Sequence, residues 1–253
     1  MTVFIRKLAA LAALALAAGA SQAATPSHLY ELNGSFADTF GGPSLVSNGG
    51  TLGASSYSFG ANQGLAVDSA LNADVYTIDT SFNFDTTNGY RRILDFQDGA
   101  SDTGLYNLNT ALNFYNIISG TGGAFADGQQ VRVTVSRDAA GTFSGYVNGV
   151  LQLTFSDSGS LASFSAINRR AHFFQDDNQV GGEASAGSVD YIAIYDQALS
   201  ATQVAALAAP VPEPETYALV LAGLLVMAAV ATRRRQSHTQ PRQLAIWRSA
   251  CAG

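Results

Sequence analysis

The stretch that decides the fold is Tyr76-Thr77-Ile78-Asp79-Thr80-Ser81-Phe82-Asn83-Phe84. Its larger side chains alternate with smaller or polar ones at a strict period of two. Because every second residue of a strand points to the same face, this pattern predicts a strand with one buried face. Val131 to Ser136 repeats the alternation. The chain therefore contains at least two strands of the same half-buried kind.

Further strands and one helix follow along the chain. Phe143–Phe155 is predicted to be a hairpin, because Asn148-Gly149 at its centre is the strongest short-range turn signal. Val189–Tyr195 is predicted to be another strand.

The only convincing helix begins at Ser200, which is expected to form a capping box with Gln203, while Leu199 packs on Val204. It is expected to end near Leu207. Many antiparallel strands and one short C-terminal helix predict an all-β, antiparallel β-sandwich or jelly roll.

The charges are distributed unevenly. Between the two ends of the chain lie six arginines, no lysine and 17 acidic residues, which gives this region a net charge of −11. Such a surface repels phosphate backbones, so nucleic acid is excluded as a partner. The single cysteine, Cys251, lies near the C-terminus, so no disulfide is expected.

The N-terminal segment has the features of a secretory signal. Arg6 and Lys7 precede an apolar run from Leu8 to Ala18, and Ser21-Gln22-Ala23 supplies the small-x-small pattern that signal peptidase requires. We expect residues 1–23 to be a signal peptide cleaved after Ala23. The apolar run is too short for a mature membrane span.

The C-terminal segment has three parts in a fixed order. Pro212, Glu213 and Pro214 form an extended stretch, the apolar run 217–232 is expected to be a single membrane helix, and Arg233, Arg234 and Arg235 are expected to stop it on the cytoplasmic side. This arrangement over residues 209–235 resembles the PEP-CTERM sorting signal. An ordinary single-pass anchor would explain the helix and the arginines but not the Pro-Glu-Pro motif.

The resemblance implies a processing partner and a destination. An exosortase-type membrane enzyme would read Pro212, Glu213 and Pro214 in an inner-membrane intermediate. The protein would then reach the cell surface or extracellular matrix of a Gram-negative-type bacterium. Residues 236–253 extend beyond the usual end of such signals, and we expect them to form a disordered polar tail.

A second resemblance concerns residues 27–208. The opening Leu29–Asp38, the hairpin Gly145–Leu151 and the closing Gly187–Asp196 are similar to segments of concanavalin A-like, laminin-G-type (LamG) domains. In that family the opening segment is the first strand. The resemblance implies two stacked antiparallel sheets and a module that binds glycans or proteins at one rim, often with calcium.

Catalytic motifs are not found in this region. Glycan-cleaving relatives carry paired carboxylates in a Glu-x-Asp-x-x-Glu pattern, whereas the only glutamates here, Glu31 and Glu183, lie far apart. His28 and His172 have no metal-ligand spacing, and we expect His172 to be a strand residue with local hydrogen bonds. We therefore predict no catalytic residues and no enzyme.

Two loops rich in oxygen ligands could bind calcium. The first contains Asp98 and Asp102, and the second contains Asp176 and Asp177 and runs on to Glu183. For the first loop, turn formation is the favoured explanation. The adjacent carboxylates of the second repel each other unless a cation lies between them, and either calcium or the nearby pair Arg169-Arg170 could meet that need.

Tyrosines are the remaining candidates for contact with a ligand. They could stack on sugar rings, but we expect most of them to be core or cross-strand residues. The set comprises Tyr57, Tyr90, Tyr106, Tyr115 and Tyr146.

The sequence thus favours a surface module that binds extracellular polysaccharide or another surface protein. A structural envelope or matrix protein without a specific ligand is the alternative, and a glycan-active enzyme is a distant third.

Overall fold

A computed structural model describes residues 24–165, 168–208, 223–224 and 227. Two compact units are distinguished, Met1–Ala209 and Pro210–Gly253. No helix within the described residues is long and apolar enough to span a membrane. The expected signal peptide 1–23, and all but three residues of the expected membrane helix 217–232, lie outside the described residues.

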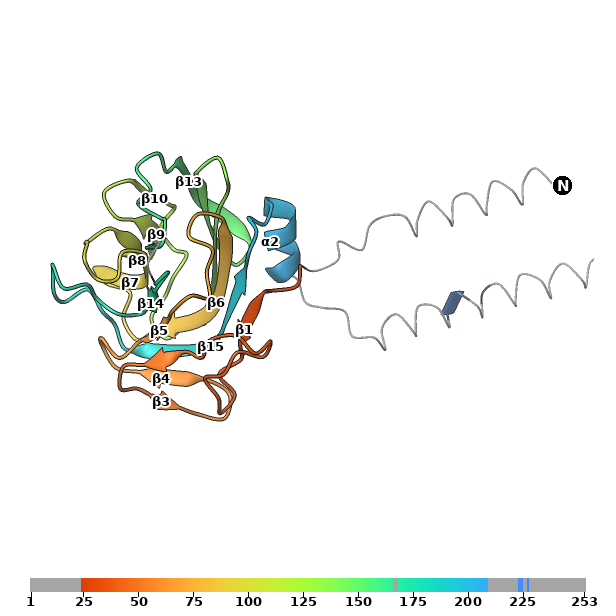
Figure 1. Cartoon of the computed structure of the whole chain (residues 1–253), viewed down its shortest axis with the longest axis horizontal. Coiled ribbons are helices and arrows are strands. Elements are labelled where there is room, and N and C mark those ends of the chain that lie inside the picture. Colours follow the sequence, from red (N-terminus) through yellow and green to blue (C-terminus); the bar gives the residue numbers. More distant parts are fainter. Residues whose placement is uncertain (1–23, 166–167, 209–222, 225–226, 228–253) are drawn as a thin grey trace, which may run out of the picture. The chain divides into compact units, whose positions relative to one another are not determined.

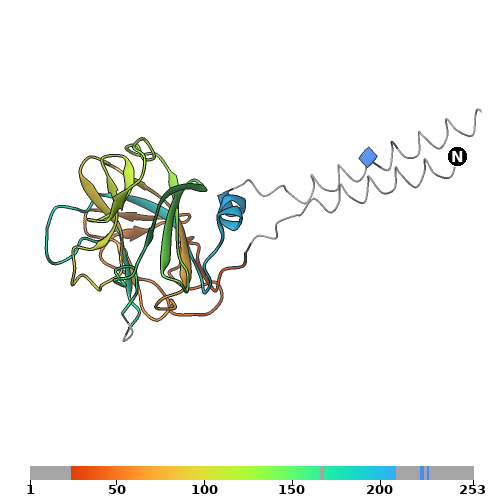
Figure 2. The same ribbon diagram turned by 90° about the horizontal axis from the view of Figure 1, so that it is seen from above.

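The described part of the first unit is a sandwich of two antiparallel sheets (Figures 1 and 2). One sheet has eight strands, with β1 paired to β15 beside the main path. Its order is β13 (Val150–Ser156), β12 (Thr142–Val147), β11 (Val131–Arg137), β6 (Tyr76–Phe84), β15 (Gly187–Tyr195), β4 (Tyr57–Phe59) and β3 (Thr51–Leu52), with β1 spanning His28–Tyr30.

The second sheet has seven strands. Its order is β10 (Ile118–Ser119), β9 (Ala111–Phe114), β8 (Gly104–Leu108), β7 (Tyr90–Asp95), β14 (Ala171–Phe173), β5 (Leu65–Val67) and β2 (Val46–Ser47). All recorded strand pairs are antiparallel, as the sequence predicts, and the fold class is confirmed.

Aromatic side chains fill the space between the sheets. Phe82 of the eight-stranded sheet is fully buried, and its ring centroid lies 4.9 Å from that of Phe174. Phe114 of the seven-stranded sheet lies 5.1 Å from Phe143 of the facing sheet. These contacts bury the larger side chains of the alternating strands, which is the main stabilising contribution in such a sandwich.

The outer face of β6 is more buried than we expected for a strand with one buried face. Thr77 and Asp79 are both fully buried. The segment that leads into α2 (Ala201–Ala208) covers Thr77, because the Leu199 N–H donates to the Thr77 hydroxyl oxygen at 2.8 Å. Asp79 is covered by side chains of neighbouring strands. Period two correctly predicted the strand, but it could not show what packs on its outer side.

The expected turn and cap are confirmed. Asn148 and Gly149 have φ values of 50° and 80°, the left-handed conformations that a two-residue hairpin between β12 and β13 requires. The Ser200 N–H donates to Gln203 Oε1 at 2.9 Å, and Leu199 and Val204 belong to one buried cluster.

One expectation from the resemblance is wrong. The first strand does not extend through Leu29–Asp38 but is limited to His28–Tyr30. Leu32 adopts a φ of 51°, which is incompatible with a continued strand.

Candidate functional site

The two oxygen-rich loops meet over the outer face of the seven-stranded sheet. One connects β7 to β8 (residues 96–103), and the other lies between β14 and β15 (residues 174–186). The Asn178 N–H donates to the Gly99 carbonyl at 3.1 Å, and the Arg92 N–H donates to the Glu183 carbonyl at 2.8 Å. Segments separated by more than seventy residues therefore form one cover over the sheet.

Arg92 lies at the centre of this region and is fully buried. Its Nη1 donates to Asp95 Oδ2 at 2.9 Å, and its Nη2 donates to the Asp102 carbonyl at 3.3 Å and also pairs with Asp177. The guanidinium lies 4.6 Å from the centroid of the Tyr106 ring. A planar cation with several donors is suited to such a set of acceptors.

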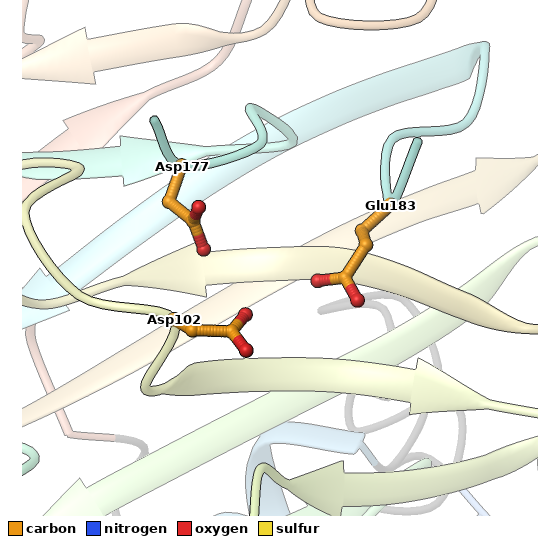
Figure 3. A group of neighbouring side chains, drawn as sticks. All are labelled: Asp102, Asp177 and Glu183. Atoms are coloured by element: carbon orange, nitrogen blue, oxygen red, sulfur yellow. The ribbon is translucent and has the colours of Figure 1, made fainter. Parts of the chain in front are cut away.

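Three carboxylates converge beside this arginine. Oxygen atoms of Asp102, Asp177 and Glu183 all lie within 4.8 Å of one another, and Figure 3 shows the three groups pointing toward a common centre. Glu183 is only 9% exposed, and its Oε2 has no hydrogen-bond partner among the described residues. Burial raises the pKa of Glu183 above its usual range, with Asp102 adding to the effect. Burial likewise raises the pKa of Asp95.

These three residues fit a divalent cation. Calcium binds oxygen ligands at about 2.3–2.6 Å, so two ligands of the same ion lie no more than about 5 Å apart. The observed spread of the oxygens is within that limit. Among the described residues, Arg92 is the one cationic side chain that pairs with Asp95, Asp102 and Asp177, so much of the local negative charge is uncompensated. A buried carboxylate oxygen without a partner is a further reason for a cation to bind.

Only two of the four predicted calcium ligands take part in this cluster. Asp102 and Asp177 lie in it, whereas Asp98 receives a hydrogen bond from the His172 ring at 2.7 Å. Asp176 uses its Oδ2 to accept the Glu183 N–H at 2.8 Å. Both therefore stabilise the loops rather than complete the cluster, and His172 is the locally hydrogen-bonded strand residue that the sequence indicates.

The arginine that neutralises Asp177 is not one of the pair expected from the sequence. Arg170 forms its ion pair with Asp68, with its Nε 2.5 Å from Oδ1. Arg169 donates to the Leu71 carbonyl at 3.3 Å. Arg92 takes the position beside Asp177 because strand pairing brings β7 next to β14. Proximity in sequence was a poor guide here.

A group of three tyrosines borders the carboxylates. The Tyr90 ring lies 5.5 Å from that of Tyr106 and 5.6 Å from that of Tyr115. Tyr90 and Tyr115 are partly exposed, whereas Tyr106 is buried. The Tyr106 hydroxyl donates to Asp102 Oδ1 at 3.1 Å, and Asp102 raises the pKa of the Tyr115 hydroxyl. The aromatic group and the carboxylates therefore form one continuous site.

An unpaired amide oxygen belongs to the same face. Asn113 on β9 is directly opposite Tyr106 on β8, so both side chains point outward. Asn113 is 6% exposed, and its Oδ1 has no partner among the described residues. The other tyrosines considered from the sequence, Tyr57 and Tyr146, are buried at 0% and 5% exposure, as expected for packing residues.

Sequence reasoning missed Arg92 and Asn113 as members of a site, and it included Glu183 in the second loop without selecting it as a ligand. Arg92 directly precedes the apolar pair Ile93-Leu94, and a charged residue within a strand of this kind indicates a buried partner. Nothing comparable marks Glu183 or Asn113, whose surroundings depend on the loops and strand register. The sorting residues Pro212, Glu213 and Pro214, the stop residues Arg233, Arg234 and Arg235, and the cleavage residue Ala23 lie outside the described residues.

Comparison with protein families identifies the superfamily of the sandwich and the type of its C-terminal signal. Residues 58–205 match the model of the concanavalin A-like lectin/glucanases superfamily, and the chain belongs to this superfamily. Residues 210–235 match the PEP-CTERM protein-sorting motif, which implies an exported protein, processing by an exosortase-type enzyme, and surface or membrane-associated sorting in Gram-negative bacteria. No curated protein sequence matches the chain.

Solved structures share the fold at low identity. A Trypanosoma rangeli sialidase in complex with 2,3-difluorosialic acid is 15% identical, with a TM-score of 0.58 over 74% of this chain and 33% of its own. Domain 4 of AbnA, an extracellular arabinanase from Geobacillus stearothermophilus, in complex with arabinotriose, is 17% identical, with a TM-score of 0.56 over 74% of this chain and 100% of its own. The binding domain of botulinum neurotoxin serotype D is 12% identical, with a TM-score of 0.53 over 73% of this chain and 51% of its own. The chain thus spans about a third of the sialidase, and these matches concern the fold alone.

Proposed function

We propose that this protein is a cell-surface or matrix module that binds neutral extracellular glycans through its sandwich, residues 27–208. The sorting motif supports export, and the superfamily supports a binding or glycan-related domain. Neutral glycans are favoured over sulfated or phosphorylated ones because the region between the chain ends has a net charge of −11.

The observation that carries this proposal is the continuous site formed by Tyr90, Tyr115, Asp102 and Glu183. Sugar rings present an apolar face that packs on aromatic side chains, and hydroxyl groups that donate to carboxylates. Two partly exposed tyrosines supply the first contact, and the carboxylates beside them supply the second. The unpaired Asn113 Oδ1 offers one more acceptor.

A calcium ion would complete the site. Asp102, Asp177 and Glu183 would hold it, and the ion would supply positive charge that fixes both loops and accepts hydroxyl oxygens as ligands. Arg92 orients Asp102 and Asp177 through its ion pairs. Asp98 and Asp176 would not bind the ion, because their hydrogen bonds stabilise the two loops.

An oligosaccharide array tests the proposal with the full chain, in calcium and in a chelator. We expect binding to neutral glycans that weakens at least tenfold in the chelator. Tyr115→Ala should reduce binding by a similar factor, because one stacking contact contributes about 1–2 kcal/mol. Phe40→Ala is the matched control, since Phe40 is an exposed aromatic in the loop after β1.

Two outcomes would contradict the proposal. Failure of every array glycan to bind in either condition would favour the structural envelope or matrix protein. Release of reducing ends from the bound glycans would favour a glycan-active enzyme, in which the buried Glu183 and the neighbouring Asp102 would be the carboxylates to replace first.

A further inference from the structure

A second hollow lies on the outer face of the other sheet, the eight-stranded one. Its volume is about 510 Å³, within the range of small-ligand sites, and residues of β1, β6, β11 and β15 line it. None of its lining residues belongs to the carboxylate and tyrosine site described above. Its ligand chemistry can therefore be considered independently of the proposed function.

The floor of this hollow is a buried and fully satisfied ion pair. Asp79 accepts hydrogen bonds from Arg132 Nε at 2.8 Å, the Thr134 hydroxyl at 2.6 Å and the Tyr191 hydroxyl at 2.8 Å. Arg132 also donates to the carbonyl of Leu207 near the end of α2. Both charges are already compensated, so this pair forms a rigid base and is not itself a free recognition group.

The Tyr195 hydroxyl is a polar group without a partner in the hollow. Tyr195 is 4% exposed, and no described residue forms a hydrogen bond with its hydroxyl. Burial raises the pKa of Tyr195 to about 12, so the hydroxyl carries its proton at neutral pH. This hydroxyl lines the hollow and is free to donate a hydrogen bond to an oxygen atom of a bound ligand.

The walls carry uncompensated negative charge. Glu31 is exposed, and its only recorded side-chain hydrogen bond comes from Asn33 at 3.3 Å. Asp190 accepts from Gln130 Nε2 at 2.7 Å through one oxygen, and no hydrogen bond is recorded at its other oxygen. Since Arg132 already balances Asp79, these two carboxylates leave the hollow negative. They favour a ligand that bears a positive charge.

The ligand must therefore combine three properties. It needs a cation for Glu31 and Asp190, an oxygen acceptor for Tyr195, and an apolar face for the partly buried Tyr191 ring and for Leu29. A lysine side chain supplies the cation but no acceptor, and a neutral sugar supplies the acceptor but no charge. We propose that this hollow binds a sugar residue with a free amino group.

Calorimetric titration of the full chain tests this with three probes: glucosamine oligosaccharides, N-acetylglucosamine oligosaccharides of the same length, and the alkyl diamine cadaverine. We expect the first to bind at least about tenfold more tightly than either of the others, because acetylation removes the charge and the protonated diamine has no acceptor. Equal affinity for the acetylated sugar or for the diamine would overturn the proposal, as would the absence of binding by the glucosamine oligosaccharides.

Variants locate the interaction. Glu31→Gln and Asp190→Asn should each weaken glucosamine binding about tenfold, and Tyr195→Phe, which removes only the hydroxyl, should weaken it several-fold. Asp196→Asn is the matched control: it removes one exposed carboxylate at the end of β15, outside the hollow, and should leave the affinity unchanged. If both Glu31→Gln and Asp190→Asn bound glucosamine oligosaccharides with wild-type affinity, the amino group would not bind at these carboxylates and the proposal would be refuted.

Discussion

At the residue scale, Arg92 compensates the charge of the carboxylates in the candidate site. It is the guanidinium in contact with Asp95, Asp102 and Asp177, and it is fully buried. Removing one partner of a buried ion network leaves the other charges without compensation, which costs more than a single hydrogen bond. The site therefore depends on this arginine for its folding as well as for its geometry.

We predict that Arg92→Met lowers the free energy of unfolding by about 3–5 kcal/mol at neutral pH. Arg92→Lys should recover little of this loss, because an ammonium group cannot reproduce the planar set of donors. Urea unfolding, followed by tyrosine fluorescence, measures both. A midpoint equal to that of the wild type in Arg92→Met would show that the carboxylates need no buried cation.

Glu183 gives a pH-dependent prediction. Burial raises its pKa in the folded state, so its ionised form at neutral pH opposes folding. This penalty declines as the pH falls below the raised pKa, and it is gone once the pH lies below the pKa of the unfolded state. In a chelator, Glu183→Gln should therefore raise the melting temperature by roughly 1–3 °C at pH 7. The difference from wild type should shrink toward pH 4.

Calorimetric melting of both proteins across this pH range makes the comparison. Added calcium should stabilise the wild type and leave Glu183→Gln nearly unchanged, since the variant lacks one proposed ligand. A variant less stable than the wild type at pH 7 in the chelator would contradict the assigned cost of the buried carboxylate.

At the scale of single elements, the sequence was most informative where local chemistry decides the conformation. Asn148-Gly149 fixed the hairpin, and Ser200 with Gln203 fixed the start of α2. It was least informative for short strands such as β2 and β5, whose two or three residues have no visible periodicity. Those strands exist because neighbouring strands supply the hydrogen bonds, which is a tertiary effect.

The hairpin provides the prediction at this scale. Gly149→Ala should destabilise the domain by about 1–2 kcal/mol, because an L-residue with a φ of 80° brings its Cβ too close to the backbone. Gly159→Ala is the control: its φ lies outside the left-handed region, and an added Cβ would meet Leu161 at an ordinary 3.6 Å. Urea unfolding should show a change of less than about 0.5 kcal/mol for the control. Equal effects of the two substitutions would argue against a strained turn.

At the scale of the whole molecule, a sandwich of the concanavalin A-like class is joined to a sorting signal in the same chain. The two have separate tasks: the signal directs the protein, and the sandwich carries the candidate ligand sites. Replacement of Pro212, Glu213 and Pro214 by alanine should therefore block processing and leave an unprocessed chain in the membrane fraction. Immunoblots of cell fractions would detect its larger mass.

The control for this experiment alters Ser237, His238 and Thr239 to alanine, in the polar segment beyond the matched motif. This variant should be processed normally. Normal processing of the Pro-Glu-Pro variant as well would contradict recognition through those three residues.

The sequence by itself determined the class of fold, the hairpin, the helix cap and the sorting motif. Each of these depends on residues close together in the chain, where alternation, turn chemistry and motif order are visible directly. It also marked the two loops that contain Asp102 and Asp177. Only the tertiary structure decided that the loops meet, that Arg92 rather than Arg170 compensates Asp177, and that Glu183 completes the cluster. The physical reason is that antiparallel pairing brings distant strands together, and the partners of a buried charge are set by that pairing rather than by distance along the chain.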